Sequence, residues 1–129
     1  MAVENEAERR RAGAPDRVSL AQLEAVIAAR RLRAELFGME LGSPGWSLLL
    51  VLFRASLERR AVGARRLAVE AGVGVAVAGR WMERLVGAGL VERVVDPGGA
   101  ALFALRLTEA GAEAMEDYFA ALLVGWRRG

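Results

Sequence analysis

The side chains of this chain that could take part in chemistry are arginines and carboxylates, because the sequence contains neither histidine nor cysteine. Histidine is the commonest general base and metal ligand, so its absence leaves the serines without a base to activate them. Three acidic residues near the C-terminus fit a solvated helix face better than a metal site; they are Glu113, Glu116 and Asp117. We therefore expect no catalytic residue, no metal and no cofactor, and a function in binding.

The basic residues are all arginine, 18 in number, against 16 acidic residues. The net charge is only +2, and the pI of 10.3 follows from the lack of lysine, histidine and cysteine rather than from a large basic excess. Position is more informative than the total. Residues 63–89 carry four arginines against two glutamates, whereas residues 108–129 carry four acidic residues against two arginines. A local basic excess of this kind points to a nucleic-acid partner.

The length and the hydropathy of the chain limit its class further. With 129 residues, 54% of them apolar, it can form one domain with a modest core. The longest apolar run, residues 48–53, is far shorter than the ~20 residues that span a bilayer. The acidic N-terminus is unlike a secretory signal, and the lack of cysteine fits a reducing compartment. We expect a cytoplasmic protein with no membrane segment.

The stretch from Gly63 to Leu107 predicts the elements that position the arginines. A short helix, a turn that holds Gly72 and Gly74, and a second helix ended by glycine account for residues 63–89. Two apolar runs, residues 90–95 and 101–107, flank the turn signal at 96–99 and predict a β-hairpin. The expected fold class is mainly α with a small β-hairpin wing (α+β), a winged helix-turn-helix.

Helices are also predicted on both sides of this stretch. Ser19 and Gln22 fit a capping box that opens a helix to about Phe37, and Ser43 fits the N-cap of the next helix. That helix is apolar on nearly all sides, which is typical of a central buried helix, with Trp46 as a core anchor. A last helix, residues 109–126, is apolar enough to need a partner surface. We expect residues 1–16 to form a disordered tail and residues 17–129 to form the domain.

Periodicity divides the second helix of the motif into two faces. The face expected to pack inward consists of Ala78, Trp81, Met82 and Leu85. The opposite face, which would meet a partner, consists of Ala76, Val77, Gly79, Arg80, Glu83 and Arg84. In the hairpin, alternation buries one strand face and turns Arg106 outward.

Six short segments in this order resemble the MarR-like winged-helix transcriptional regulators, over about residues 30–120. They are Arg33–Gly38, Ser43–Trp46, Ala71–Val73, Gly79–Trp81, Gly89–Arg93 and Leu107–Gly111. The resemblance implies a homodimer held by the terminal helices, the second helix of the motif in the DNA major groove, and the wing over the minor groove. It also allows a small-molecule effector between the dimerising helices and the core, with Trp46 or Trp126 as lining residues.

Two departures from that family leave an alternative open. Relatives place hydroxyl residues where this chain has Ala76 and Val77, and a charged pair at the wing tip where this chain has residues 97–101 without a cation. Our main hypothesis is a DNA-binding regulator in which Arg80 reads a guanine edge. Arg84, Arg65 and Arg66 would hold phosphates, and Arg93 or Arg106 would be a secondary backbone contact. The alternative is a winged-helix dimerisation or protein-interaction module with weak or lost DNA binding.

Overall fold

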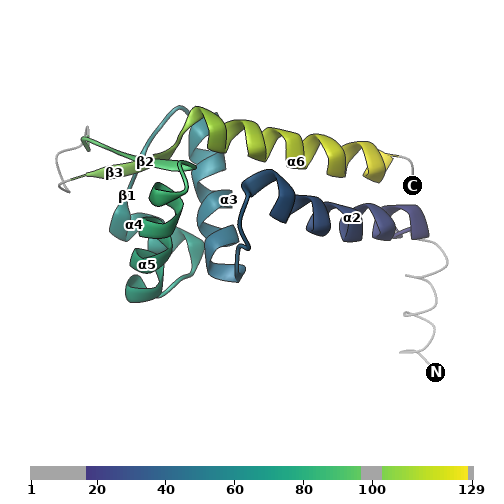
Figure 1. The fold of residues 1–129 in the computed structure, drawn as a ribbon, viewed down its shortest axis with the longest axis horizontal. Coiled ribbons are helices and arrows are strands. Elements are labelled where there is room, and N and C mark those ends of the chain that lie inside the picture. Colours follow the sequence, from purple (N-terminus) through teal and green to yellow (C-terminus); the bar gives the residue numbers. More distant parts are fainter. Residues whose placement is uncertain (1–16, 97–102, 128–129) are drawn as a thin grey trace, which may run out of the picture.

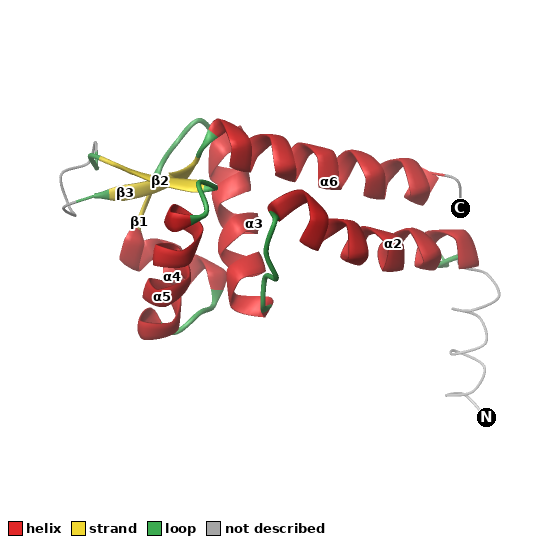
Figure 2. Cartoon of the chain, viewed as in Figure 1, coloured by secondary structure: helices red, strands yellow, loops and turns green. Residues whose placement is uncertain are grey.

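The computed structural model describes residues 17–96 and 103–127, and it is mainly helical with one small antiparallel sheet (Figures 1 and 2). Two long helices lie side by side as an arm, and the arm projects from a smaller body that holds the other elements (Figure 1). The elements are α2 (Leu20–Phe37), α3 (Ser43–Leu57), β1 (Val62–Gly63), α4 (Ala64–Ala71), α5 (Val75–Gly87), β2 (Val91–Val94), β3 (Ala104–Leu107) and α6 (Glu109–Arg127). The predicted winged-helix fold class is confirmed.

Helix α3 is the centre of the core, as its all-round apolar sequence predicts. Leu48, Leu49 and Leu52 are almost completely buried, and α3 contacts α4, α5, β3 and α6. Trp46 packs edge-on against Phe37 of α2 and Tyr118 of α6, so its expected role as a core anchor is confirmed. This aromatic contact joins the body to the arm.

The helix ends agree with the predicted caps, with one correction. Ser19 and Gln22 form the complete capping box of α2, and Gly38 ends that helix in the left-handed conformation. The expectation that Ser43 is the N-cap of α3 is wrong, because Ser43 is already helical and Gly42 is the N-cap without a side-chain hydrogen bond. Pro44 fits either the first or the second position of a helix, so it does not determine at which residue α3 begins.

In the helix-turn-helix, glycines lie at the helix ends, as the sequence predicts. Gly72 takes a left-handed conformation with φ of 67° at the end of α4, and Gly74 is the N-cap of α5. At the end of α5, the amide of Leu90 donates to Leu85 and that of Gly89 donates to Val86. These two bonds form a Schellman motif, and Gly89 with φ of 77° supplies the left-handed residue that the motif needs.

The sheet has three strands in the order β1-β3-β2, rather than the two of a simple hairpin. Strand β1 pairs Val62 with Leu105, and β2 pairs Arg93 with the same residue from the other side. A two-residue strand has no periodicity of its own, which is why the sequence does not reveal β1. The predicted wing tip lies at residues 97–101 and the predicted tail at residues 1–16, both outside the described residues.

The start of α6 is bonded directly to the end of the helix-turn-helix. The hydroxyl of Thr108 donates to the Gly89 carbonyl over 2.6 Å and accepts from the Gly111 amide over 3.1 Å. A Cβ at Gly111 would lie 2.1 Å from the Leu90 carbonyl oxygen, so only glycine permits this approach. Thr108 thus caps α6 and also ties it to the end of α5.

The arm packs through small side chains. A Cβ at Gly125 of α6 would lie 2.5 Å from the Cβ of Ala25 in α2, so the two helices approach closely there. Apolar side chains form a stripe along α2 that this chain leaves uncovered, with Leu20 73% exposed and Leu23 and Ile27 about half exposed. No helix in the described residues is long and apolar enough to cross a membrane.

Candidate nucleic-acid interface

Helix α5 presents one face to solvent because the other face is held in the core. Ala78, Met82 and Leu85 are buried against α3 and its neighbours, as the sequence predicts. Ala76 and Arg80, one helical turn apart, are exposed on the opposite side. Arg80 has no ion-pair partner among the described residues, so its guanidinium is available to a ligand.

Trp81 fixes how α5 lies on α3. Its ring covers Gly45, where a Cβ would lie 2.7 Å from the ring, and it also lies against Gly42. The Arg84 guanidinium lies over the Trp81 ring, 4.4 Å from the ring centre. A cation–π contact orients an arginine without neutralising its charge, so Arg84 keeps its positive charge at the edge of the exposed face.

Glu83 joins α5 to the wing. It forms an ion pair with Arg93 of β2, and the Arg93 guanidinium also lies 5.6 Å from the centre of the Phe103 ring. Phe103, which directly precedes β3, is 37% exposed, and Arg93 lies over its ring. Two of the predicted site residues are therefore paired with each other, and Arg93 is oriented toward α5.

Helix α4 carries one free and one paired arginine. Arg65 has no ion pair among the described residues, whereas Arg66 donates from Nε to Glu70 over 3.1 Å. The same carboxylate accepts from Arg54 of α3 over 2.6 Å and lies 3.6 Å from Arg60. Burial alone would raise the pKa of Glu70, but the hydrogen bond from Arg66 and the charges of the three arginines lower it overall.

Arg106 lies apart from the other predicted residues. It points from β3 to the sheet face opposite Arg93, and its Nε donates to Glu92 of the neighbouring strand over 2.6 Å. With Arg59 and Arg60 it lines a separate hollow at the base of the sheet. The structure thus gathers Arg80, Arg84 and the small residues on α5, and it does not bring Arg106 to them.

Sequence reasoning missed Val75, the first residue of α5. Its side chain is 64% exposed at the leading end of the helix, although valine would ordinarily be assigned to the core. The signal was its place directly after Gly74, since a residue in the first helical turn has no preceding turn to cover it. Val77 and Gly79 are half-exposed on the two flanks of the α5 face.

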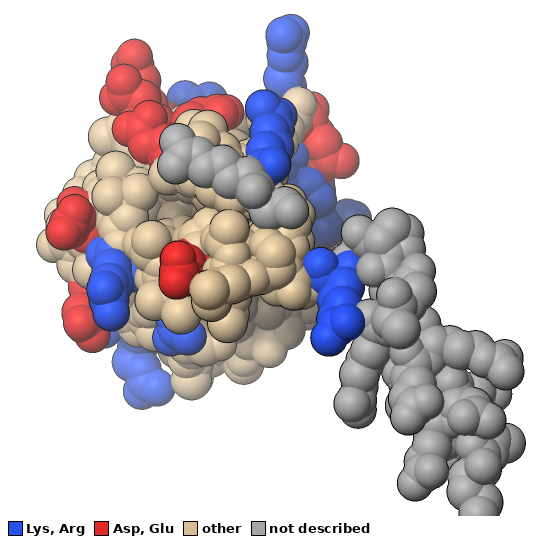
Figure 3. All heavy atoms as spheres, turned by 90° about the vertical axis from the view of Figure 1, so that its right-hand side faces the viewer, with Lys and Arg blue, Asp and Glu red and all other residues tan. Residues whose placement is uncertain are grey.

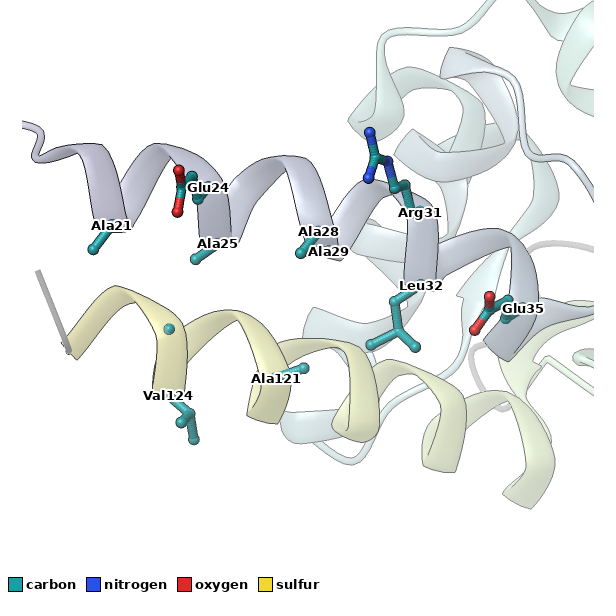
Figure 4. A pocket seen from close by; sticks show the side chains of 11 residues that line it. Ala21, Glu24, Ala25, Ala28, Ala29, Arg31, Leu32, Glu35, Ala121 and Val124 are labelled. Carbon is teal, nitrogen blue, oxygen red and sulfur yellow. The ribbon is translucent and has the colours of Figure 1, made fainter.

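A groove of about 640 Å³ lies between α2 and α6 on the arm (Figure 4). Figure 4 shows Ala21, Ala25 and Leu32 of α2 directed toward α6, with charged side chains near the rim. Neither tryptophan proposed as an effector contact lines it, because Trp46 packs at the aromatic junction and Trp126 lies 41% exposed near the end of α6. The structure does not bring these two tryptophans together.

At the sequence level, no protein-family model and no curated protein matches the chain. Solved structures match it well in fold. RV1404 from Mycobacterium tuberculosis is 20% identical with a TM-score of 0.68, covering 98% of this chain and 76% of its own. The S. aureus MepR–DNA complex is 15% identical with a TM-score of 0.64, covering 78% of each chain.

Wild-type MarR from E. coli, in its apo form, is 21% identical with a TM-score of 0.56, covering 81% of this chain and 77% of that one. Further neighbours are described as transcriptional regulators of the MarR family from Silicibacter pomeroyi. This chain therefore has the MarR-type winged-helix fold, and the resemblance stated from its sequence is confirmed.

Proposed function

We propose that the protein is a homodimeric transcriptional regulator that binds duplex DNA, with α5 in the major groove. The observation that carries the proposal is the exposed face of α5. There Arg80 has no ion pair within the described part of the chain, while the opposite face is fixed by Trp81 and the core. That MepR, which has a similar fold, has been solved in complex with DNA supports DNA binding by a protein of this fold. Such a regulator would act in the cytoplasm, and it would need no catalytic group.

The proposed contacts divide by chemistry. Arg80 would read a guanine edge, since a guanidinium donates two hydrogen bonds to guanine O6 and N7. Arg84 and Arg65, neither of which pairs with a carboxylate among the described residues, would hold phosphates. Arg66, Arg93 and Arg106 each contact a glutamate, so they would contribute only where a phosphate competes with that carboxylate. Glu83 would act mainly through Arg93.

The uncovered arm supports a dimer formed through α2 and α6. Their exposed apolar side chains are Leu20, Leu23, Ile27, Leu123, Val124 and Trp126. Seen along the arm, this end of the molecule shows a broad uncharged area with most charged side chains toward its margin (Figure 3). Exposed apolar side chains on two adjacent helices favour association. Light scattering should give twice the chain mass at micromolar concentration, and a stable monomer would contradict this part of the proposal.

The groove between α2 and α6 is the proposed site for a small-molecule effector. The groove between α2 and α6 has a volume within the ~300–1,000 Å³ of ligand pockets. It also adjoins the surface proposed for dimerisation, so a ligand there would bear on how two copies are arranged.

The decisive experiment is selection of the purified protein against a random duplex DNA library at low and near-physiological salt. We expect an enriched, roughly palindromic motif that survives the higher salt. Arg80→Ala should weaken binding to that motif by about 1–3 kcal/mol and relax the preference at one base pair. Binding of all sequences with the parent affinity by Arg80→Ala would refute its assigned role.

The alternative, a protein-interaction module, is favoured by two observations. The leading end of α5 is apolar, at Val75 and Ala76, and glutamates pair with three of the candidate arginines. Salt separates the two functions, because phosphate contacts weaken steeply as salt is added and an apolar docking patch does not. A selection that enriches no motif at either salt would favour this alternative.

A further inference from the structure

The leading end of α5 is apolar around Arg80, which forms no ion pair with the residues that the structure describes. Val75 is 64% exposed, Ala76 is exposed one turn before Arg80, and Gly79 offers no side chain at all. A Cβ built at Gly79 meets nothing within 4 Å, so the protein itself leaves this space empty. Glu83, a polar residue further along the helix, is engaged in an ion pair with Arg93.

Only one base presents an apolar group in the major groove. Thymine carries the C5-methyl, whereas adenine, guanine and cytosine show hydrogen-bond donors and acceptors that an alkyl side chain leaves unsatisfied. Valine and alanine at the tip of a major-groove helix therefore favour a thymine methyl over any other base edge. The empty space at Gly79 permits the close approach that such a contact needs, because a gap of about 0.5–1 Å already removes roughly a quarter to a half of the dispersion attraction.

We propose that Val75 and Ala76 are specificity-determining residues that bind thymine methyl groups beside the base pair read by Arg80. This rests on the proposed function, and it adds what that function leaves open, namely the base content of the site. A half-site of this protein then contains a guanine for Arg80 and one or two thymines within the next few base pairs. The apolar tip thus reads sequence without hydrogen bonds.

The experiment uses the full chain and the duplex enriched by the selection. Each thymidine of that duplex is replaced in turn by 2′-deoxyuridine, which removes only the C5-methyl, and the Kd is measured by fluorescence anisotropy. At the contacted thymine we expect a roughly fourfold weaker Kd, the loss that corresponds to one buried methyl group. Thymidines outside the contact serve as controls in the same series.

The variant Val75→Ala separates a direct contact from an effect on DNA shape. Val75 is exposed and alanine has the higher helix propensity, so the fold is retained. If Val75 holds the methyl, the deoxyuridine penalty at its thymine shrinks toward onefold in Val75→Ala. An equal penalty in both proteins, or a Kd unchanged by deoxyuridine at every position, overturns the inference and leaves DNA binding intact. A selection that enriches no duplex would refute the proposed function and the inference with it.

Discussion

Gly79 offers a test in which protein stability and DNA binding should change in opposite directions. It lies inside α5, where glycine costs roughly 0.5–1 kcal/mol relative to alanine because the unfolded chain has more backbone freedom to lose. The added Cβ of Gly79→Ala meets no atom within 4 Å, so nothing in the fold offsets this gain. We expect the free energy of unfolding to rise by about 0.5–1 kcal/mol.

The same methyl group would occupy the space through which α5 approaches DNA. Adding a methyl to a close contact typically costs about 1–3 kcal/mol. We therefore expect Gly79→Ala to bind the selected duplex roughly 5- to 150-fold more weakly. Urea denaturation at fixed protein concentration measures the first effect, and anisotropy titration with the duplex measures the second.

Gly87→Ala is the matched control. Gly87 is the last residue of α5, and a Cβ there also meets nothing within 4 Å, but it lies two turns after Gly79. It should bind DNA as the parent does. If Gly79→Ala is more stable and binds DNA unchanged, α5 does not approach DNA at this position. If it is less stable than the parent, the assumption of open space is wrong.

Two further predictions concern the glutamates. Glu83→Gln should free Arg93 of each protomer for a phosphate, so DNA affinity should rise. The plot of log K against log salt should steepen by about two units for the dimer, whereas an unchanged slope would show that Arg93 contacts no phosphate. The pKa of Glu70 is lowered in the folded state. Its carboxylate therefore stabilises the fold at any pH above the ordinary carboxyl pKa, and this stabilisation is lost as the pH falls through the lowered pKa. The stability difference between the parent and Glu70→Gln, from urea melts between about pH 7 and about pH 3, should shrink as pH falls; a constant difference would contradict the ion-pair account.

The local features of this fold could be predicted because each is determined by a few neighbouring residues. The capping box at Ser19, the left-handed glycines at Gly72 and Gly89 and the two faces of α5 all follow from short-range rules. The predicted N-cap of α3, Ser43, differs by one residue from the observed N-cap, Gly42, because serine and glycine are both acceptable at an N-cap. Strand β1 was missed because its pairing with β3 is entirely long-range.

The ionic partners within the candidate site could not be predicted. Glu83 and Arg93 are ten residues apart in different elements, and Glu70 gathers arginines from α3, α4 and the loop between α3 and β1. Charge counting treats every arginine alike, but packing decides which of them a glutamate neutralises. The exposed α2 stripe illustrates the same limit, since periodicity identifies an apolar face without saying whether this chain or a partner covers it.

The division between free and paired arginines leads to a quantitative expectation for DNA binding. With Arg80 on a base, Arg65 and Arg84 are the remaining candidate arginines of each protomer that have no ion pair among the described residues. They give four phosphate contacts in a dimer and a salt slope of about −4. If the three paired arginines also held phosphates, ten contacts would give a slope of about −9. A shallow slope means that nonspecific attraction is weak. Recognition must then depend on the guanine contact and on the apolar tip of α5, and not on a large electrostatic contribution.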